Sequence, residues 1–91
     1  MRANGYNSKT HVGAYIGNFI QKQGLGIKSC AVEAEIKYNT LYAIVKGNCN
    51  IGLKAYFRIA EYMSGKTFIP IEHYLRRLHE EYNKGKIKNE K

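Results

Sequence analysis

Apolar side chains recur at spacings of three and four residues in five short segments of this chain, and glycine or proline marks most of their ends. This spacing places side chains on one face of an α-helix. The pattern predicts an all-α fold of four to five short helices, at residues 11–23, 27–35, 39–46, 51–63 and 70–83. No internal repeat or long linker interrupts the pattern, so we expect one compact domain with a modest core.

Residues with known end preferences mark the boundaries of the first three helices. Thr10 is placed to cap the first helix, and Gly24 to end it. Gly47 is expected to close the third helix in a left-handed backbone conformation. Within the first helix, Gly13 and Gly17 each lower helix propensity by about 1 kcal/mol relative to alanine, and we expect them to mark close packing of another helix.

The connection between the last two helices is predicted to be short. Ser64-Gly65 is expected to stop the fourth helix, and Pro70 suits the first turn of the fifth. Residues 66–69 are expected to be extended, and Phe68 with Ile69 is a candidate short strand.

The charge balance indicates an anionic partner. The 91 residues include 15 Lys and Arg against 7 acidic residues, a formal net charge of +8. Such an excess favours nucleic acid first and a membrane surface second, although a lysine-rich soluble protein without such a partner would show it too. The composition, 44% hydrophobic and 12% aromatic, is that of a globular protein.

Several classes of function and location are disfavoured. The beginning of the chain has no apolar signal segment, and no stretch approaches 18 apolar residues, so we expect a cytoplasmic protein. Cys30 and Cys49 are expected to be buried, reduced thiols. The histidines and cysteines do not form a metal-binding set, aspartate is absent, and no phosphate loop or nucleophile elbow occurs. We therefore expect no enzyme, no metal and no cofactor.

The middle of the chain carries a specific motif. The segment SCAVEAEIKYNTLYAIVKGN resembles the helix-turn-helix of the lambda-repressor-like family, also called the Cro or xenobiotic-response-element type. The resemblance rests on the spacing of the small, aliphatic and glycine residues Ala31, Ile36, Leu41, Ile44 and Gly47. The segments YIGNFIQKQGL and LKAYFRIAEYM resemble the first and fourth helices of the family, so the likeness covers about residues 11–64.

The sequence departs from the family pattern at three positions. Glu35 stands where glycine is usual before the aliphatic turn residue. Ile27 stands where glutamine is frequent, and Lys37 where serine or threonine is frequent. The resemblance implies a lambda-repressor-like domain at residues 10–66, preceded by a flexible arm at residues 1–9 from which Arg2 and Lys9 can reach the duplex.

The resemblance further implies that the helix at about residues 39–46 enters the major groove of double-stranded DNA. Its expected base contacts are Tyr38, Asn39, Tyr42 and Ala43. Asn39 can pair with adenine, or it can instead cap the helix; Tyr38 can instead pack against the second helix. The expected phosphate contacts are Lys28, Lys37, Thr40, Lys46, Asn48, Asn50 and Lys54.

The C-terminal helix, residues 67–83, carries a wide apolar stripe. We expect it to form the interface of a homodimer through Phe68, Ile71, Tyr74, Leu75, Leu78 and Tyr82; alternatively it folds back on the first and fourth helices. Residues 84–91 are expected to be a basic disordered tail.

Three functions remain in competition. The first is a sequence-specific regulator of transcription, a nucleoid-associated repressor of phage or mobile-element type in a bacterial or phage-infected cell. The second is a protein-interaction module on the same fold that docks a larger protein partner. The third is nonspecific binding of nucleic acid through charge.

Overall fold

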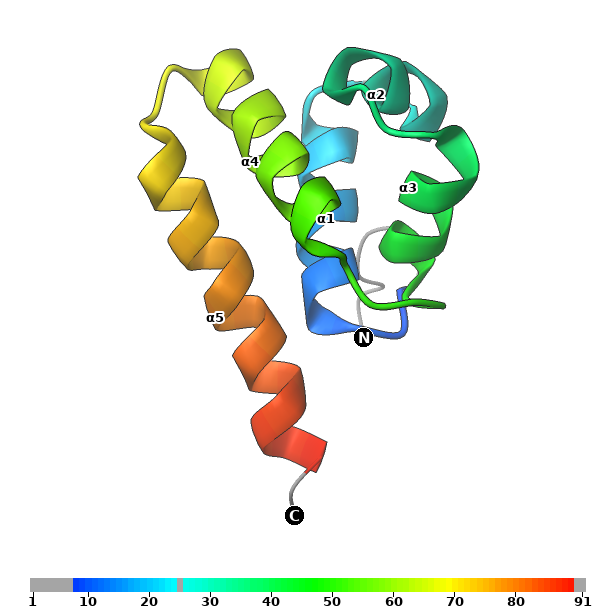
Figure 1. Cartoon of the computed structure of the whole chain (residues 1–91), viewed down its shortest axis with the longest axis vertical. Coiled ribbons are helices and arrows are strands. Elements are labelled where there is room, and N and C mark those ends of the chain that lie inside the picture. The colour runs from blue at the N-terminus through cyan, green and yellow to red at the C-terminus, as the bar shows by residue number, and fades with distance from the viewer. Residues whose placement is uncertain (1–7, 25, 90–91) are drawn as a thin grey trace.

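The computed structural model describes residues 8–24 and 26–89, with side chains as far as residue 84. These residues form five helices and no strand, which confirms the all-α prediction (Figure 1). The helices are α1 (His11–Lys22), α2 (Ile27–Ala34), α3 (Tyr38–Lys46), α4 (Leu53–Thr67) and α5 (Ile71–Asn89).

The ends of α1 and α3 are held together. Thr10 caps α1 as predicted, with its Oγ1 accepting a hydrogen bond of 3.0 Å from the backbone N–H of Gly13. Gly47 ends α3 at φ 82°, in the predicted left-handed conformation. The N–H of Lys9 donates to the carbonyl of Lys46 at 3.0 Å, so the chain entering α1 is fixed to the end of α3. The rest of the predicted arm, residues 1–7 with Arg2, lies outside the described residues.

The core lies where α1 meets the other helices. α1 packs against α2, α3 and α5, while α4 packs against α2 and α5. The largest side chains with almost no exposed surface are Ile16, Ile20, Leu41, Ile44, Ile59, Met63 and Leu78. Each such residue stabilises the fold by roughly 1.5–3 kcal/mol through removal of apolar surface from water.

The C-terminal helix folds back on α1 and α4, as the alternative prediction had it. Tyr74 and Leu78 are 4% and 0% exposed within the single chain, so their assignment to a dimer interface is wrong. Ile71 and Leu75 are partly buried against the same core, whereas Tyr82 is 41% exposed. The stripe is buried inside the monomer because α1 and α4 leave an apolar surface that no other helix covers.

Helix α5 is also longer than predicted. Its backbone is helical through Asn89, and in Figure 1 its C-terminal end extends past the other helices. The prediction of a disordered tail is therefore wrong for residues 84–89, while residues 90 and 91 lie outside the described part. Lysines at alternate positions do not prevent the helix from continuing, because the earlier turns of α5, which pack on the core, have already nucleated it.

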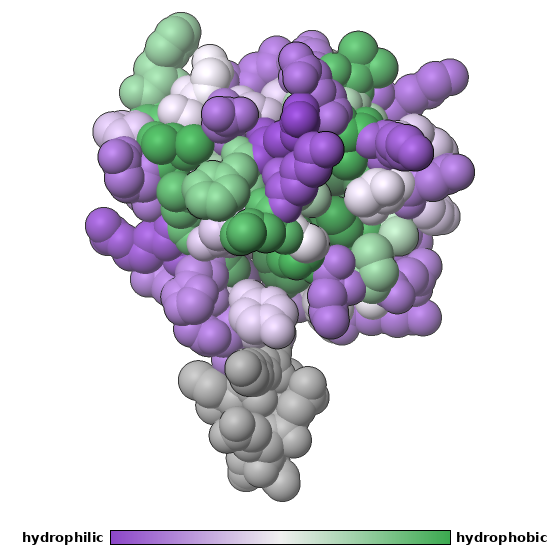
Figure 2. Space-filling view, viewed as in Figure 1, coloured by the Kyte–Doolittle hydropathy of each residue, from purple (hydrophilic) through white to green (hydrophobic). Residues whose placement is uncertain are grey.

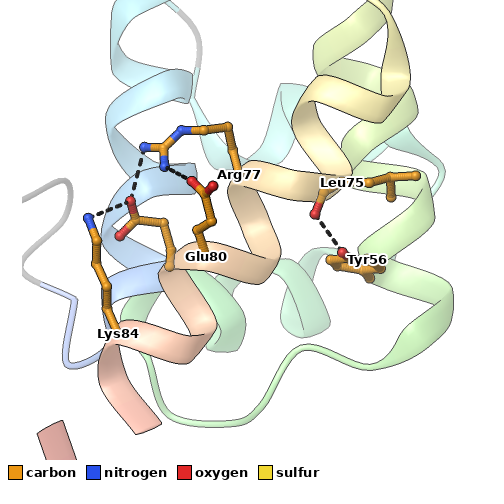
Figure 3. A network of polar contacts seen from close by, with 6 residues as sticks. Tyr56, Leu75, Arg77, Glu80 and Lys84 are labelled. Atoms are coloured by element: carbon orange, nitrogen blue, oxygen red, sulfur yellow. Dashed lines mark hydrogen bonds and ion pairs between the residues drawn. The ribbon is translucent and has the colours of Figure 1, made fainter. Parts of the chain in front are cut away.

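Hydrogen bonds fix α5 to α4. The Tyr56 hydroxyl donates to the Leu75 carbonyl at 2.6 Å, which joins α4 to the second turn of α5 (Figure 3). The Thr67 and Tyr74 hydroxyls are 2.8 Å apart at the end of α4. The register between α4 and α5 is therefore set at two places.

A charged network fixes α5 to α1. The Arg77 guanidinium lies over the Tyr15 ring, 4.9 Å from its centroid. The same guanidinium donates to Glu80 at 2.8 Å and to Glu81 at 3.0 Å, and Glu81 also accepts from Lys84 at 3.2 Å (Figure 3). The two carboxylates hold the guanidinium in place beside the ring, which favours the cation–π contact.

The connection between α4 and α5 differs from the prediction. Helix α4 continues through Ser64-Gly65 to Thr67, and no strand forms at Phe68 and Ile69. Phe68 ends the helix in the left-handed region at φ 64°, and its N–H donates to the Ser64 carbonyl at 2.7 Å. A residue other than glycine in this conformation costs about 1–2 kcal/mol. Its side chain is 92% exposed.

Gly13 and Gly65 are both helical glycines, yet they should respond oppositely to alanine. A Cβ at Gly13 would lie 2.6 Å from the Ile44 carbonyl oxygen of α3, whereas a Cβ at Gly65 would meet nothing within 4 Å. Gly13→Ala should therefore destabilise the protein by about 1–3 kcal/mol, because α1 and α3 must separate. Gly65→Ala should stabilise it by up to about 1 kcal/mol through helix propensity. Urea unfolding of both variants checks this, and a stabilised Gly13→Ala protein would contradict the close approach.

Candidate nucleic-acid interface

Helices α2 and α3 are joined by three residues, Glu35 to Lys37. Glu35 has φ 60° and ψ 44°, so this position requires the left-handed conformation in which glycine is favoured. Arg58 of α4 donates to the Glu35 carboxylate at 3.0 Å and to its carbonyl at 3.3 Å, which holds the turn. The N–H of Ile36 donates to the Ala31 carbonyl at 2.9 Å. Glutamate is thus accommodated where the resemblance leads one to expect glycine.

Helix α3 buries one side and exposes the other. Leu41, Ile44 and Val45 are at most 1% exposed, and Ala31 of α2 is 2% exposed. Because Ala31 is small and fully covered, α2 and α3 can lie close together. This packing leaves the opposite side of α3 turned towards solvent.

The four predicted base contacts lie on this outer side at positions that are neighbours on a helix. Tyr38 and Tyr42 are 46% and 41% exposed, and their ring centroids are 5.9 Å apart with 31° between the ring planes. Asn39 is exposed as well, whereas Ala43 is half-buried. The structure therefore brings the four residues together on one face, and Ala43 is the least accessible of them.

One of the two alternatives for this face is excluded. Helix α3 begins at Tyr38 with Lys37 as its N-cap residue, one position earlier than predicted, so Asn39 lies inside the first turn and does not cap the helix. Tyr38 is 46% exposed and lies beside Tyr42, so its partial burial against α2 stays a prediction.

The predicted phosphate contacts lie in the first turns of α2, α3 and α4, at the end of α3 and in the loop after it. Lys28 lies in the first turn of α2, Lys37 is the N-cap residue of α3, and Lys54 lies in the first turn of α4. None of these three lysines makes an ion pair within the described residues. Thr40, Asn48 and Asn50 are exposed, and Lys46 is half-buried.

The N-terminal ends of these three helices share an electrostatic property. No side chain caps α2, α3 or α4, and none of them has an acidic residue in its first turn. Their first N–H groups therefore have no capping carboxylate or hydroxyl, and the positive end of each helix dipole is not neutralised. Such ends attract anions.

Charge is distributed unevenly along the chain, a feature that a total net charge conceals. Residues 1–60 contain eight basic residues and only two acidic ones, Glu33 and Glu35. Both carboxylates are paired with α4: Glu33 with Lys66 at 2.8 Å, and Glu35 with Arg58 at 3.0 Å. Residues 36–60, which include α3, contain no acidic residue at all. Counting charges along the chain would have located this region from the sequence.

The described residues offer no candidate for two other kinds of site. No cluster of three or more histidine, cysteine or acidic side chains there is arranged to hold a metal ion. None of the described helices combines the length and the hydropathy needed to cross a bilayer.

The two cysteines differ in environment, contrary to prediction. Cys30 of α2 is 1% exposed, whereas Cys49 lies exposed in the loop between α3 and α4. Cys49 lies between Asn48 and Asn50 in a loop that leaves the core immediately after Gly47, so the prediction of burial is wrong for this thiol. Burial raises the pKa of the Cys30 thiol to about 11, an effect that the nearby Tyr62 hydroxyl partly offsets.

Comparisons with protein-family models, with curated proteins and with solved structures find no match for this chain.

The thiols should be distinguishable by alkylation. At pH 7.5 a pKa of about 11 leaves Cys30 almost entirely protonated, and its burial blocks access, so a maleimide should label one thiol per chain, Cys49. Unfolding in guanidinium should raise this to two. Mass spectrometry of the labelled protein measures the count, and Cys49→Ser should remove the fast reaction. Two fast thiols in the folded protein would show that Cys30 is not buried.

Proposed function

We propose that this protein is a sequence-specific double-stranded DNA-binding regulator of transcription that reads the major groove with α3. One observation carries the proposal. Helix α3 is fixed and buried along one side, and its exposed side is neutral and lies in a region without acidic residues. A major groove about 12 Å wide admits one α-helix, and base edges are read by hydrogen-bonding and apolar groups. The resemblance to lambda-repressor-like proteins supports a small repressor of phage or mobile-element type.

Asn39 is the base-reading residue in this proposal. Its amide is exposed in the first turn of α3 and makes no hydrogen bond within the described residues, so both its donor and its acceptor are available. An asparagine amide pairs in a bidentate manner with adenine N6 and N7, a contact worth about 1–3 kcal/mol of discrimination. The Tyr38 and Tyr42 rings flank it and can contact thymine methyl groups or donate to phosphate. Half-buried Ala43 allows the helix to approach the bases closely.

The phosphate contacts supply affinity and orientation. The uncapped beginnings of α2, α3 and α4 each carry a lysine and free backbone N–H groups, a combination suited to phosphate oxygens. Three anchoring points at three helices fix the rotation of α3 in the groove. Specificity and affinity thereby come from different residues.

One observation favours a second candidate function, a protein-interaction module. Tyrosine is enriched at protein interfaces, and the exposed Tyr38–Tyr42 pair carries no charge. A partner protein would then cover the same face of α3.

Binding to DNA upstream of the protein's own gene, measured by mobility shift, should be sequence-specific. The shift should persist in excess competitor DNA, and the logarithm of the affinity should fall with the logarithm of salt with a slope of about −3 to −4 per copy, since four candidate lysines surround α3. Selection from random duplexes provides a second source of sites. Binding abolished equally by any competitor would indicate nonspecific binding, and absence of binding at low salt would favour the interaction module.

Asn39→Ala and Lys37→Ala should have different effects. Asn39→Ala should reduce the preference for the cognate site about 10-fold or more, while binding of unrelated DNA stays the same. Lys37→Ala should weaken binding to every duplex and lower the salt slope by about 1. Titrations with cognate and scrambled duplexes measure both effects.

The matched control for Lys37→Ala is Arg76→Ala, which removes the same charge from the exposed side of α5, a helix packed on α1 and α4. It should leave binding nearly unchanged. Thermal unfolding of Asn39→Ala should match the wild type, because the amide does not cap α3. If Asn39→Ala lost stability but kept its site preference, the base-reading role would be wrong.

A further inference from the structure

Apolar surface remains on the outer side of α4 after α5 has folded back. Leu53 and Phe57, one turn apart, are 73% and 46% exposed, and Phe68 at the end of the same helix is 92% exposed. Ile69 and Tyr82, at 39% and 41%, extend this surface at its two ends. Figure 2 shows hydrophobic side chains gathered over the α4 and α5 side of the face it views. We call these five residues the α4 face.

One end of the α4 face is hollowed and the other end projects. A groove of about 280 Å³ opens between the beginning of α4 and the later turns of α5, lined among others by Leu53, Tyr56, Leu78 and Tyr82. At the opposite end of α4, Phe68 stands almost fully in solvent. A groove at one end of a helix and an exposed aromatic ring at the other end can fit together when a second copy of the same helix is turned through 180°.

Phe68 of the α4 face and the nearby Gly65 of α4 each have a feature that contacts inside the chain do not explain. Phe68 adopts a left-handed conformation at φ 64°, although its side chain is almost entirely exposed within the single chain. Gly65 lies within α4, where glycine lowers helix propensity, and a side chain there would meet nothing within 4 Å. Both are features that contact with another molecule would explain.

We propose that a second copy of the chain covers the α4 face, with the two α4 helices antiparallel about a two-fold axis and Phe68 of each copy in the groove beside Leu53 of the other. The spacing along α4 supports this register. Leu53 and Phe57 are four residues apart, and so are Ser64 and Phe68; when Leu53 faces Phe68, Phe57 faces Ser64 and Gly65. The absent side chain at Gly65 leaves room for the Phe57 ring. Every contact occurs twice, as two-fold symmetry requires.

The available area suits a weak, reversible dimer. From the exposed fractions of the five residues, and taking about 150–250 Å² for a fully exposed large side chain, each copy contributes roughly 500 Å² of mostly apolar surface. Two copies thus bury about 1,000 Å², the lower bound for a specific interface. Glu61, one turn beyond Phe57, lies close to the proposed axis, and the two like charges limit the affinity. The dimer deepens the proposed function, since two-fold operators bind two-fold proteins, but it can be tested without DNA.

Sedimentation equilibrium of the full chain tests the interface. The wild type should dimerise with a Kd of about 10–100 µM, and Leu53→Asn or Phe68→Asn should weaken it about 10-fold or more. Val32→Asn is the matched control, since Val32 is also 73% exposed but lies on α2. Glu61→Gln should tighten the dimer about two- to fivefold. The proposal is overturned if the wild type stays monomeric at 1 mM, or if Val32→Asn dimerises as weakly as Leu53→Asn.

Phe68→Asn separates loss of the interface from loss of folding. Asparagine tolerates the left-handed conformation, so at low micromolar concentration, where the chain is monomeric, the variant should melt about 2–6 °C higher than the wild type. It should therefore be a more stable monomer and a poorer dimer. A variant that melts lower and associates less would indicate only damage to the fold, which overturns the assignment of Phe68 to the interface.

Cross-linking tests the antiparallel register. In a Cys49→Ser background, Leu53→Cys and Phe68→Cys chains are mixed and treated with a short bismaleimide; Cys30 stays buried and unreactive. The register predicts cross-links between position 53 of one copy and position 68 of the other, because like positions lie about 22 Å apart along the two helices. Products linking like positions would overturn it. Neither assay contains DNA. If the protein is monomeric, the DNA-binding proposal is still tested by the mobility shift. If the mobility shift fails, the dimer proposal is unaffected.

Discussion

The close approach of α1 to α3 at Gly13 is the contact on which the rest of the structure depends. The Ile44 carbonyl occupies the space that a side chain at position 13 would need, and the N–H of Lys9 binds the Lys46 carbonyl beside it. This contact joins the beginning of α1 to the last turn of α3, so α3 cannot rotate about its own axis. Since Leu41 and Ile44 then face the core, Asn39 and Tyr42 must face solvent. The orientation of the candidate DNA-reading face follows from the missing side chain of a glycine.

Much of this arrangement could be predicted from residue types, and the failures have definite causes. Apolar periodicity found all five helices and the buried side of α3, because a helix face is a local property of the sequence. The left-handed residues Glu35 and Phe68 could not be found in this way, since residue-type rules assign that conformation to glycine. The sequence also does not tell whether Tyr74 and Leu78 pack within one chain or between two chains, because the same apolar stripe can pack in either way. Exposure of Cys49 depends on the path of a loop, which its neighbours do not determine.

The candidate site was predicted in residue identity but not in electrostatics. Tyr38, Asn39 and Tyr42 are exposed together, as the resemblance implied, whereas Ala43 is more enclosed. The structure adds that the two carboxylates of residues 1–60 are both neutralised by α4. It also adds that three helices begin without a capping side chain. These properties depend on partners distant in sequence and on backbone geometry, so a motif cannot reveal them.

The neutral character of α3 and the proposed dimer are connected through specificity. In the proposed complex each copy would offer one side-chain amide to the bases, and a bidentate pair contributes about 1–3 kcal/mol of discrimination. Specific binding typically exceeds nonspecific binding by about 4–10 kcal/mol, so one copy with this face cannot reach that range from Asn39 alone. Two copies reading two half-sites double the contribution and bring it to the lower part of the range. A weak dimer suffices for this purpose, because DNA holding one copy raises the effective concentration at which the second copy meets it. In the proposed complex, a second copy of the reading face would therefore double the discrimination that Asn39 supplies, while the lysines around α3 supply affinity.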